Sequence, residues 1–119
     1  MLRDLDLAFM RLHVLYHAVQ EPFYGAAMME ELRRHGYTIS AGTFYPLVHK
    51  MEAADLLTVT ERVVNGRQRK YYAATPQGKA VLDEARTKLT ELATEVLEGH
   101  GPEQLPDPPT DASSAAEAS

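Results

Sequence analysis

The 119-residue sequence contains no cysteine and no apolar run near the roughly 20 residues that a membrane-spanning helix needs. The absence of cysteine excludes disulfides, thiolate metal sites and a cysteine nucleophile. The first six residues mix two acids into an apolar stretch and offer no cleavage-like site, so we expect no secretory signal. We therefore expect a cytoplasmic protein without membrane association.

Motifs for catalysis are also missing. The sequence has no phosphate-binding loop, no nucleophile motif and no protease-type pair of histidine and glutamate. We predict neither an enzyme nor a bound cofactor. The composition, 45% apolar and 24% charged, is typical of a soluble globular domain.

The net charge of −5 argues against a nucleic-acid partner until its distribution is considered. Residues 1–75 hold nine lysines and arginines against eight acids, a balance of +1. Residues 76–119 hold three against nine, a balance of −6. Four of the basic residues gather within positions 62–70, so a cluster suited to phosphate lies in an otherwise acidic chain.

Helical periodicity marks the first third of the chain. Its apolar residues recur in steps of four and three at Leu5, Phe9, Leu12, Tyr16 and Val19, and Ala8, Leu15 and Ala18 widen the stripe. This pattern predicts a helix over residues 2–20 with two buried faces. Pro22 ends it, because proline disfavours helical geometry in the residue before it. A second, short helix is predicted over residues 24–35, with Gly36 as a left-handed C-terminal cap.

A third helix is predicted from about residue 43 to residue 56. Pro46 is tolerated in the first turn of a helix but costs about 3 kcal/mol in the interior. Thr43 or Gly42 is therefore the predicted N-cap, with Ser40 as the alternative if the first turn is irregular. The helix is expected to bury Phe44, Leu47, Val48 and Met51. The opposite face would then present Thr43, Pro46, His49, Lys50 and Ala53.

A β-hairpin is predicted after the third helix. The apolar period changes to two from residue 57, and Asn65-Gly66 separates two strand-like runs. Both residues tolerate the positive φ of a type I′ turn. A two-residue loop places Arg62 opposite Arg69, which is unfavourable in an isolated sheet. That pair indicates either an anionic partner or a longer loop with a shifted register.

A last helix is predicted to open with Thr75 as N-cap and Pro76 as first helical residue. Apolar residues repeat along this helix in steps of three and four and form an apolar seam that consists of Leu82, Ala85, Leu89, Leu92 and Val96. A helix of this length, to about residue 98, spans roughly 34 Å, which is longer than so small a core can cover. Part of the seam therefore needs a partner, and we predict a homodimer.

These elements, in this order, predict a mainly α fold with a β-hairpin wing: a winged helix-turn-helix with an added C-terminal helix. We assign residues 1–75 to a DNA-binding domain, 76–99 to a dimerisation helix and 100–119 to a disordered acidic tail. The predicted contacts to double-stranded DNA are Ser40, Thr43, Tyr45, Pro46, His49, Lys50, Asn65, Gly66, Arg67, Gln68, Arg69 and Lys70.

Several motifs together carry a family resemblance. They are Tyr24-Gly25, Ser40-Ala41-Gly42-Thr43-Phe44-Tyr45-Pro46-Leu47, Gly66-Arg67-Gln68-Arg69-Lys70-Tyr71-Tyr72 and Thr75-Pro76-Gln77-Gly78. Over about residues 5–98 the chain resembles the PadR-type transcriptional regulators, in their compact subgroup with one C-terminal helix. The resemblance implies a homodimeric repressor of a pseudo-palindromic operator. It also implies a dimer contact between the last helix and the first, where Leu5, Phe9 and Leu12 lie, and a small aromatic or lipophilic effector near that contact.

Two alternatives remain open from the residues. His13, His17 and Glu21 recur at every fourth position of the first helix, a spacing that can present metal ligands on one face. We assign no metal site, because a fourth ligand is missing and Pro22 frays that end of the helix. The alternative function is a winged-helix metal sensor that uses His13 and His17. A protein-interaction module without DNA binding is the second alternative.

Overall fold

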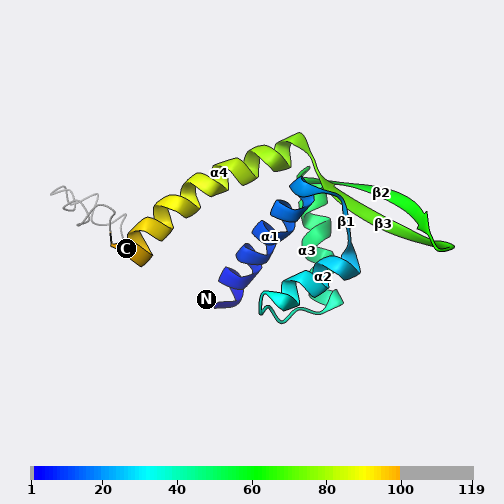
Figure 1. The fold of residues 1–119 in the computed structure, drawn as a ribbon, viewed down its shortest axis with the longest axis horizontal. Helices are drawn as coiled ribbons and strands as arrows, with labels where there is room; N and C mark the ends of the chain where they lie inside the picture. Colours follow the sequence, from blue (N-terminus) through cyan, green and yellow to red (C-terminus); the bar gives the residue numbers. More distant parts are fainter. Residues whose placement is uncertain (1, 100–119) are drawn as a thin grey trace, which may run out of the picture. The chain divides into compact units, whose positions relative to one another are not determined.

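The computed structural model describes residues 2–99, and the predicted tail at 100–119 lies outside them. The elements follow in the order α1 (Leu2–Gln20), β1 (Phe23–Tyr24), α2 (Gly25–Arg34), α3 (Ala41–Ala53), β2 (Leu57–Val64), β3 (Arg67–Ala74), α4 (Pro76–Ala93) and the π-helical turn η1 (Thr94–Glu98) (Figure 1). This order confirms the mainly α winged fold. The chain divides into two compact units, Met1–Arg86 and Thr87–Ser119. Among the described helices, none is long and apolar enough to cross a membrane.

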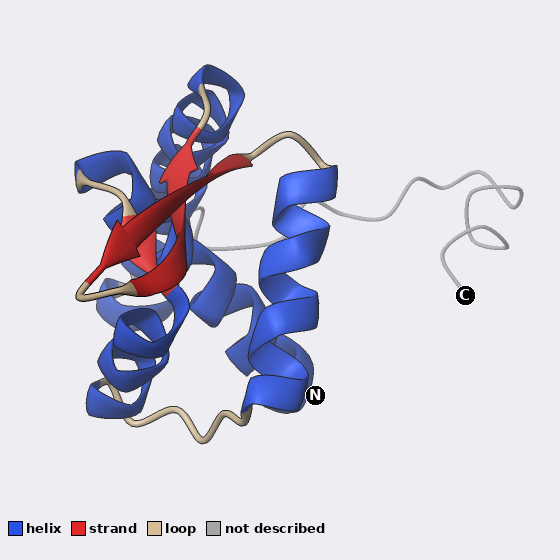
Figure 2. Cartoon of the chain, turned by 90° about the vertical axis from the view of Figure 1, so that its right-hand side faces the viewer, coloured by secondary structure: helices blue, strands red, loops and turns tan. Residues whose placement is uncertain are grey.

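The core of the first unit lies between α1, α2, α3 and the sheet. Its buried residues are Met10, Val14, Leu15, Ala18, Phe23, Met28, Leu32, Ile39, Phe44, Leu47, Val48, Met51, Leu57, Tyr72 and Leu82. The predicted buried face of α3 is confirmed, because all four of its expected residues belong to this cluster. Figure 1 shows β2 and β3 as a paired ribbon that extends away from these helices, and Figure 2 shows the strands together with the helices in a view turned by 90°.

The predicted helix over residues 2–20 is confirmed as α1, and the core buries one side of it. The helix buries Met10, Val14, Leu15 and Ala18, whereas Leu5 and Tyr16 of the predicted stripe are 39% and 45% exposed. Two apolar stripes overlap on this helix, and periodicity alone does not say which one faces the core. Phe9, Leu12 and Val19 of the same stripe are half-buried.

The alternative start predicted for α3, with Ser40 as N-cap, is confirmed, and the preferred start at Thr43 or Gly42 is wrong. Ser40 is the N-cap, and its carbonyl accepts from the N–H groups of Thr43 (3.1 Å) and Phe44 (2.9 Å). Pro46 consequently lies inside the helix, where it cannot donate to the carbonyl of Gly42. The helix also ends at Ala53, earlier than expected. Burial of the apolar face of α3 offsets the cost of an interior proline.

The sheet contains one strand that the sequence did not predict. Its order is β1-β3-β2, and every pairing is antiparallel. β1 pairs Phe23 with Tyr72 and Tyr24 with Tyr71, so the chain is extended where a helix was expected to start at Tyr24. A strand of two residues has no periodicity of its own and exists because β3 supplies its hydrogen-bond partners.

The start of α4 agrees with the prediction. The Thr75 hydroxyl accepts from the N–H of Gly78 at 2.9 Å and donates to the carbonyl of Asp55, which ties the helix to the turn after α3. The helical run ends in η1 near the predicted residue 98, and Gly99 follows with a φ of 71°.

Candidate nucleic-acid interface

The outer face of α3 is open to solvent. Its exposed members among the predicted DNA contacts are Ser40, Pro46, His49 and Lys50, and its half-buried members are Thr43 and Tyr45. The first amides of a helix and its dipole favour a phosphate at the N-terminus. α3 can therefore offer both a phosphate site and polar side chains to a groove.

Tyr45 has a packing role besides its predicted contact. Its ring lies edge-on to Phe44, with 5.2 Å between the centroids. A Cβ placed on Gly25 would lie only 2.6 Å from the Tyr45 hydroxyl oxygen. Glycine at the first residue of α2 therefore makes room for this tyrosine, and the ring fixes α3 against α2.

The hairpin has the two-residue type I′ loop. Asn65 and Gly66 have φ angles of 52° and 77°. Val64 pairs with Arg67, and Arg62 pairs with Arg69. The shifted register is therefore wrong, and two arginines do face each other across the ribbon.

Each of these arginines stacks on a tyrosine. The guanidinium carbon of Arg62 lies 4.5 Å from the ring centre of Tyr71, and that of Arg69 lies 4.6 Å from the ring centre of Tyr24. Such cation–π contacts contribute about 0.5–1 kcal/mol at exposed sites, comparable to the repulsion of like charges in a cross-strand pair. The tyrosines hold both charges at the surface of the wing. Sequence reasoning missed Tyr24 and left Arg62 out of the predicted site.

A cleft lies between the wing and the helices α2 and α3. It is lined by Tyr24, Gly25, Ala26, Tyr45, Arg67, Gln68, Arg69, Lys70 and Tyr72. The structure thus brings four of the predicted wing residues together with Tyr45 of α3. Ser40, Thr43, His49 and Lys50 do not line this cleft.

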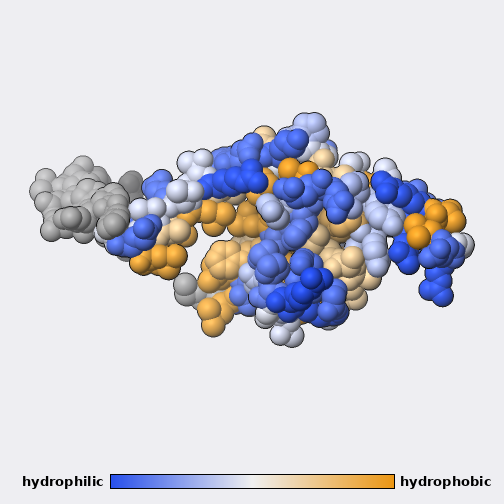
Figure 3. Space-filling model, viewed as in Figure 1, coloured by the Kyte–Doolittle hydropathy of each residue, from blue (hydrophilic) through white to orange (hydrophobic). Residues whose placement is uncertain are grey.

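The wing is not uniformly cationic. Glu61 lies opposite Lys70, and its carboxylate accepts a hydrogen bond from the side-chain amide of Gln68. Val63 is 74% exposed, and Figure 3 shows apolar surface at the end of the hairpin. The glutamate thus binds Gln68, and the cationic side chains of the wing are those of Arg62, Arg67, Arg69 and Lys70.

The predicted dimer residues differ in exposure. Leu5, Leu89, Leu92 and Val96 are exposed, Phe9, Leu12 and Ala85 are half-buried, and Leu82 belongs to the core. Leu92 and Val96, at 57% and 67%, are the most exposed of the set. Both are large apolar side chains that a single chain leaves in water at a cost.

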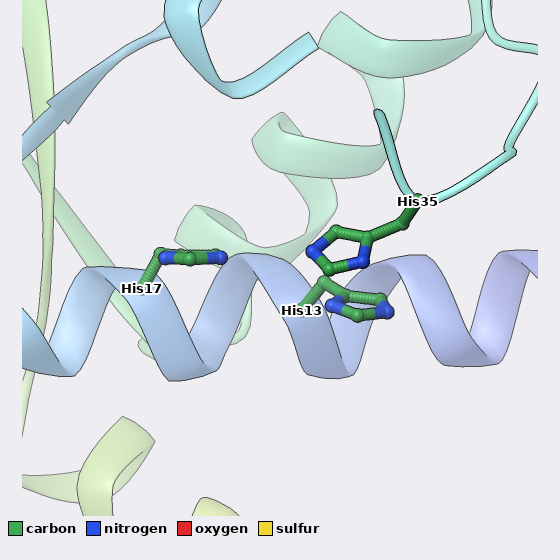
Figure 4. Close-up of side chains that lie close together, drawn as sticks. All are labelled: His13, His17 and His35. Carbon is green, nitrogen blue, oxygen red and sulfur yellow. The ribbon is translucent and has the colours of Figure 1, made fainter. Parts of the chain in front are cut away.

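Three histidines form the metal-capable group found in the described residues. His13 and His17 of α1 meet His35, the C-cap of α2, and one ligand atom of each lies within 4.8 Å of the others (Figure 4). Glu21, which the sequence suggested as a ligand, is not in this group. Burial lowers the pKa of His13, His35 and His17 lower it further by charge repulsion, and Glu31 opposes them.

The exposed third helix and the cationic two-stranded wing define a winged-helix protein of the DNA-binding class. Residues 14–84 match the PadR-like family of transcriptional regulators. The chain is 50% identical over 98 residues to the transcriptional regulator Rv3488 of Mycobacterium tuberculosis (strain ATCC 25618 / H37Rv), covering 82% of this chain and 92% of the relative. The chain belongs to the PadR-like family of transcriptional regulators.

Solved structures agree with this assignment. A PadR family transcriptional regulator from Eggerthella lenta DSM 2243 superposes with a TM-score of 0.70 at 33% identity, covering 82% of this chain and 87% of that chain. A PadR-like transcriptional regulator from Bacillus cereus strain ATCC 14579 gives a TM-score of 0.71 at 30% identity, covering 76% and 90%. The winged fold is thus shared with regulators of the same family.

Proposed function

We propose that this regulator is a cytoplasmic repressor that binds a pseudo-palindromic operator as a homodimer. The observation that carries the proposal is the pairing of Arg62 with Arg69 on an exposed ribbon. A like-charge pair across two strands destabilises a free hairpin, whereas a phosphate backbone turns it into a favourable arrangement.

The proposed contacts divide between two elements. α3 enters the major groove, where His49 and Lys50 reach base edges or phosphates, and Ser40 and Thr43 contact phosphate at its N-terminus. The wing, with Arg67, Arg69 and Lys70, lies along the neighbouring backbone. Most of the affinity then comes from the wing and is insensitive to sequence, while α3 supplies the specificity.

The proposed homodimer uses the apolar residues of α1 and of the C-terminal helix. Support comes from their exposure: Leu5, Leu89, Leu92 and Val96 are all exposed in the single chain. Figure 3 shows apolar surface along the end of α4. Residues 1–75 would then be the DNA-binding domain, and 76–99 the dimerisation helix. A twofold dimer presents two copies of α3, which is why the operator should be an inverted repeat.

We also propose a small aromatic or lipophilic effector near the dimer contact. This part rests on the family resemblance and on the apolar character of Leu89, Leu92 and Val96. Such side chains suit an apolar ligand better than a charged one.

The test of DNA binding compares two double variants by fluorescence anisotropy over a range of salt concentrations. Arg67→Ala with Arg69→Ala should lower affinity for every DNA sequence and reduce the salt slope by about 2, roughly one unit per lost phosphate contact. The control, Arg11→Ala with Lys79→Ala, removes the same charge from exposed residues outside the wing and should keep the slope. Equal slopes for the two variants would contradict the proposal and favour the interaction module.

Operator symmetry needs a separate experiment. Selection of bound DNA from a random pool should enrich an inverted repeat whose half-sites are about one helical turn apart. Enrichment of a single half-site would contradict the homodimeric mode of binding.

A further inference from the structure

The three histidines have the geometry of a metal-ligand set. His13 and His17 lie on successive turns of α1, and His35 caps α2, so residues distant in sequence meet at one place (Figure 4). One nitrogen of each ring lies within 4.8 Å of the others. We propose that His13, His17 and His35 bind a divalent first-row transition metal ion such as zinc.

The distances require only side-chain adjustment. Zinc binds imidazole nitrogen at about 2.0–2.1 Å, so tetrahedral ligation places the nitrogens about 3.4 Å apart. The rings of His13 and His35 are stacked, with 4.4 Å between centroids and 25° between planes. Rotation about the side-chain torsions tilts one nitrogen of each ring toward a common point, while the helix backbones stay in place.

The donor set selects the class of metal. Imidazole suits zinc, nickel, cobalt and divalent copper, whereas monovalent copper prefers thiolates and magnesium prefers oxygen ligands. The chain contains no cysteine. Three protein ligands leave one position on a tetrahedral ion for water or another small ligand.

Glu31 supports a cation at this site. It lies one turn before His35 on α2 and lines a groove together with His17. Its carboxylate also lies 3.8 Å from the guanidinium of Arg34. A carboxylate near imidazole ligands can accept a ring N–H and orient the ring, so Glu31 is the proposed positioning residue.

The site has an entry path. A groove lined partly by His17, Glu31 and Arg34 opens beside the cluster. His35 is exposed, and His13 and His17 are half-buried. An ion can therefore reach the rings from solvent without unfolding of α1 or α2.

A bound ion would tie α1 to the end of α2. The chain leaves α2 through Gly36, whose φ is 92°, and continues to α3. Ligation of His35 therefore fixes one side of the turn that precedes α3. The titration of the metal site uses no DNA. The metal-site proposal and the DNA-binding proposal can therefore be contradicted independently of each other.

The experiment is calorimetric titration of zinc into the untagged full chain. We expect one ion per cluster in the wild type and an affinity at least about tenfold lower in His35→Ala and in His17→Ala. Glu21→Ala and His49→Ala are matched controls: the first removes the ligand that spacing alone suggested, the second an exposed histidine of α3. Both controls should bind zinc as the wild type does. Zinc should also raise the melting temperature of the wild type but not of His35→Ala.

A measurement on the unmodified chain makes the test independent of variant folding. Zinc should slow carbethoxylation of His17 and His35 and leave that of His49 unchanged. The proposal is overturned if the wild type binds zinc no more tightly than His35→Ala. It is equally overturned if Glu21→Ala loses binding that His35→Ala keeps, or if zinc protects none of the three rings.

Discussion

Arg62 and Arg69 face each other across the wing, and each lies over a different tyrosine, Tyr71 for the first and Tyr24 for the second. Tyr24 belongs to β1 and Tyr71 to β3. The three-stranded sheet is thus the platform that holds two like charges at the surface. A substitution at this pair can therefore change DNA binding without a large change in the free energy of unfolding.

Arg62→Ala should weaken DNA binding and leave the fold nearly as stable. The change removes a cation–π contact and a like-charge repulsion, which oppose each other at about 0.5–1 kcal/mol each, so the free energy of unfolding should change by less than about 0.5 kcal/mol. Urea unfolding and anisotropy measure the two effects. Lys79→Ala, an exposed lysine of α4, is the control for loss of one charge. A stability loss above about 1 kcal/mol would show that Arg62 is mainly structural.

Gly78→Ala should destabilise the protein by about 2 kcal/mol or more. A Cβ at Gly78 would lie 2.2 Å from the carbonyl oxygen of Leu56, a backbone atom that cannot move independently. Gly42→Ala is the matched control, because its Cβ would meet only the Ser40 hydroxyl oxygen at 3.8 Å. That change should stabilise α3 by about 0.4–1 kcal/mol. Thermal unfolding measures the stability of both variants. Similar melting temperatures for the two would contradict the close approach of Gly78 to the carbonyl oxygen of Leu56.

Leu89→Asp with Leu92→Asp should convert the proposed dimer into a monomer. Both residues are exposed in the single chain, and a charge on each would have to lose its water in an apolar interface. Sedimentation equilibrium measures the mass. Thr87→Asp places a charge on the opposite side of the same helix and should leave the dimer intact. If the double variant is still a dimer, the interface does not include Leu89 and Leu92.

Tyr72 should make the fold sensitive to alkaline pH. Burial raises the pKa of its hydroxyl above the ordinary 10.0, and Tyr45 and Glu52 raise it further. The contribution of this tyrosine to the free energy of unfolding is complete below pH 10.0. It is lost as the pH rises toward the pKa of Tyr72 in the folded state, because the unfolded chain releases its proton first. The drop in unfolding free energy between about pH 9 and about pH 11 should be smaller in Tyr72→Phe. Tyr16→Phe, at an exposed tyrosine, should drop as the wild type does.

Local signals predicted the wing and the start of α4 well. Asn65 and Gly66 tolerate positive φ at no great cost, so the turn and the Arg62–Arg69 register follow from the sequence. The first backbone N–H groups of a helix have no partner within the helix. The Thr75 hydroxyl accepts a hydrogen bond from one of them, and Pro76 has no N–H that needs a partner. Each of these features depends on the conformational preferences of neighbouring residues, and neighbours in the chain are what a sequence displays.

Other features required contacts between distant segments. β1 exists because β3 offers it hydrogen bonds, Pro46 is tolerated because α3 buries its apolar face, and His35 joins His13 because α2 ends beside α1. The choice between the two apolar stripes of α1 has the same origin. The amino-acid order determined turns, caps and the position of the charges. The packing of α1, α2, α3 and β3 decided which faces are buried and which histidines meet, since burial and ligand distances depend on residues that the chain brings together only when it folds.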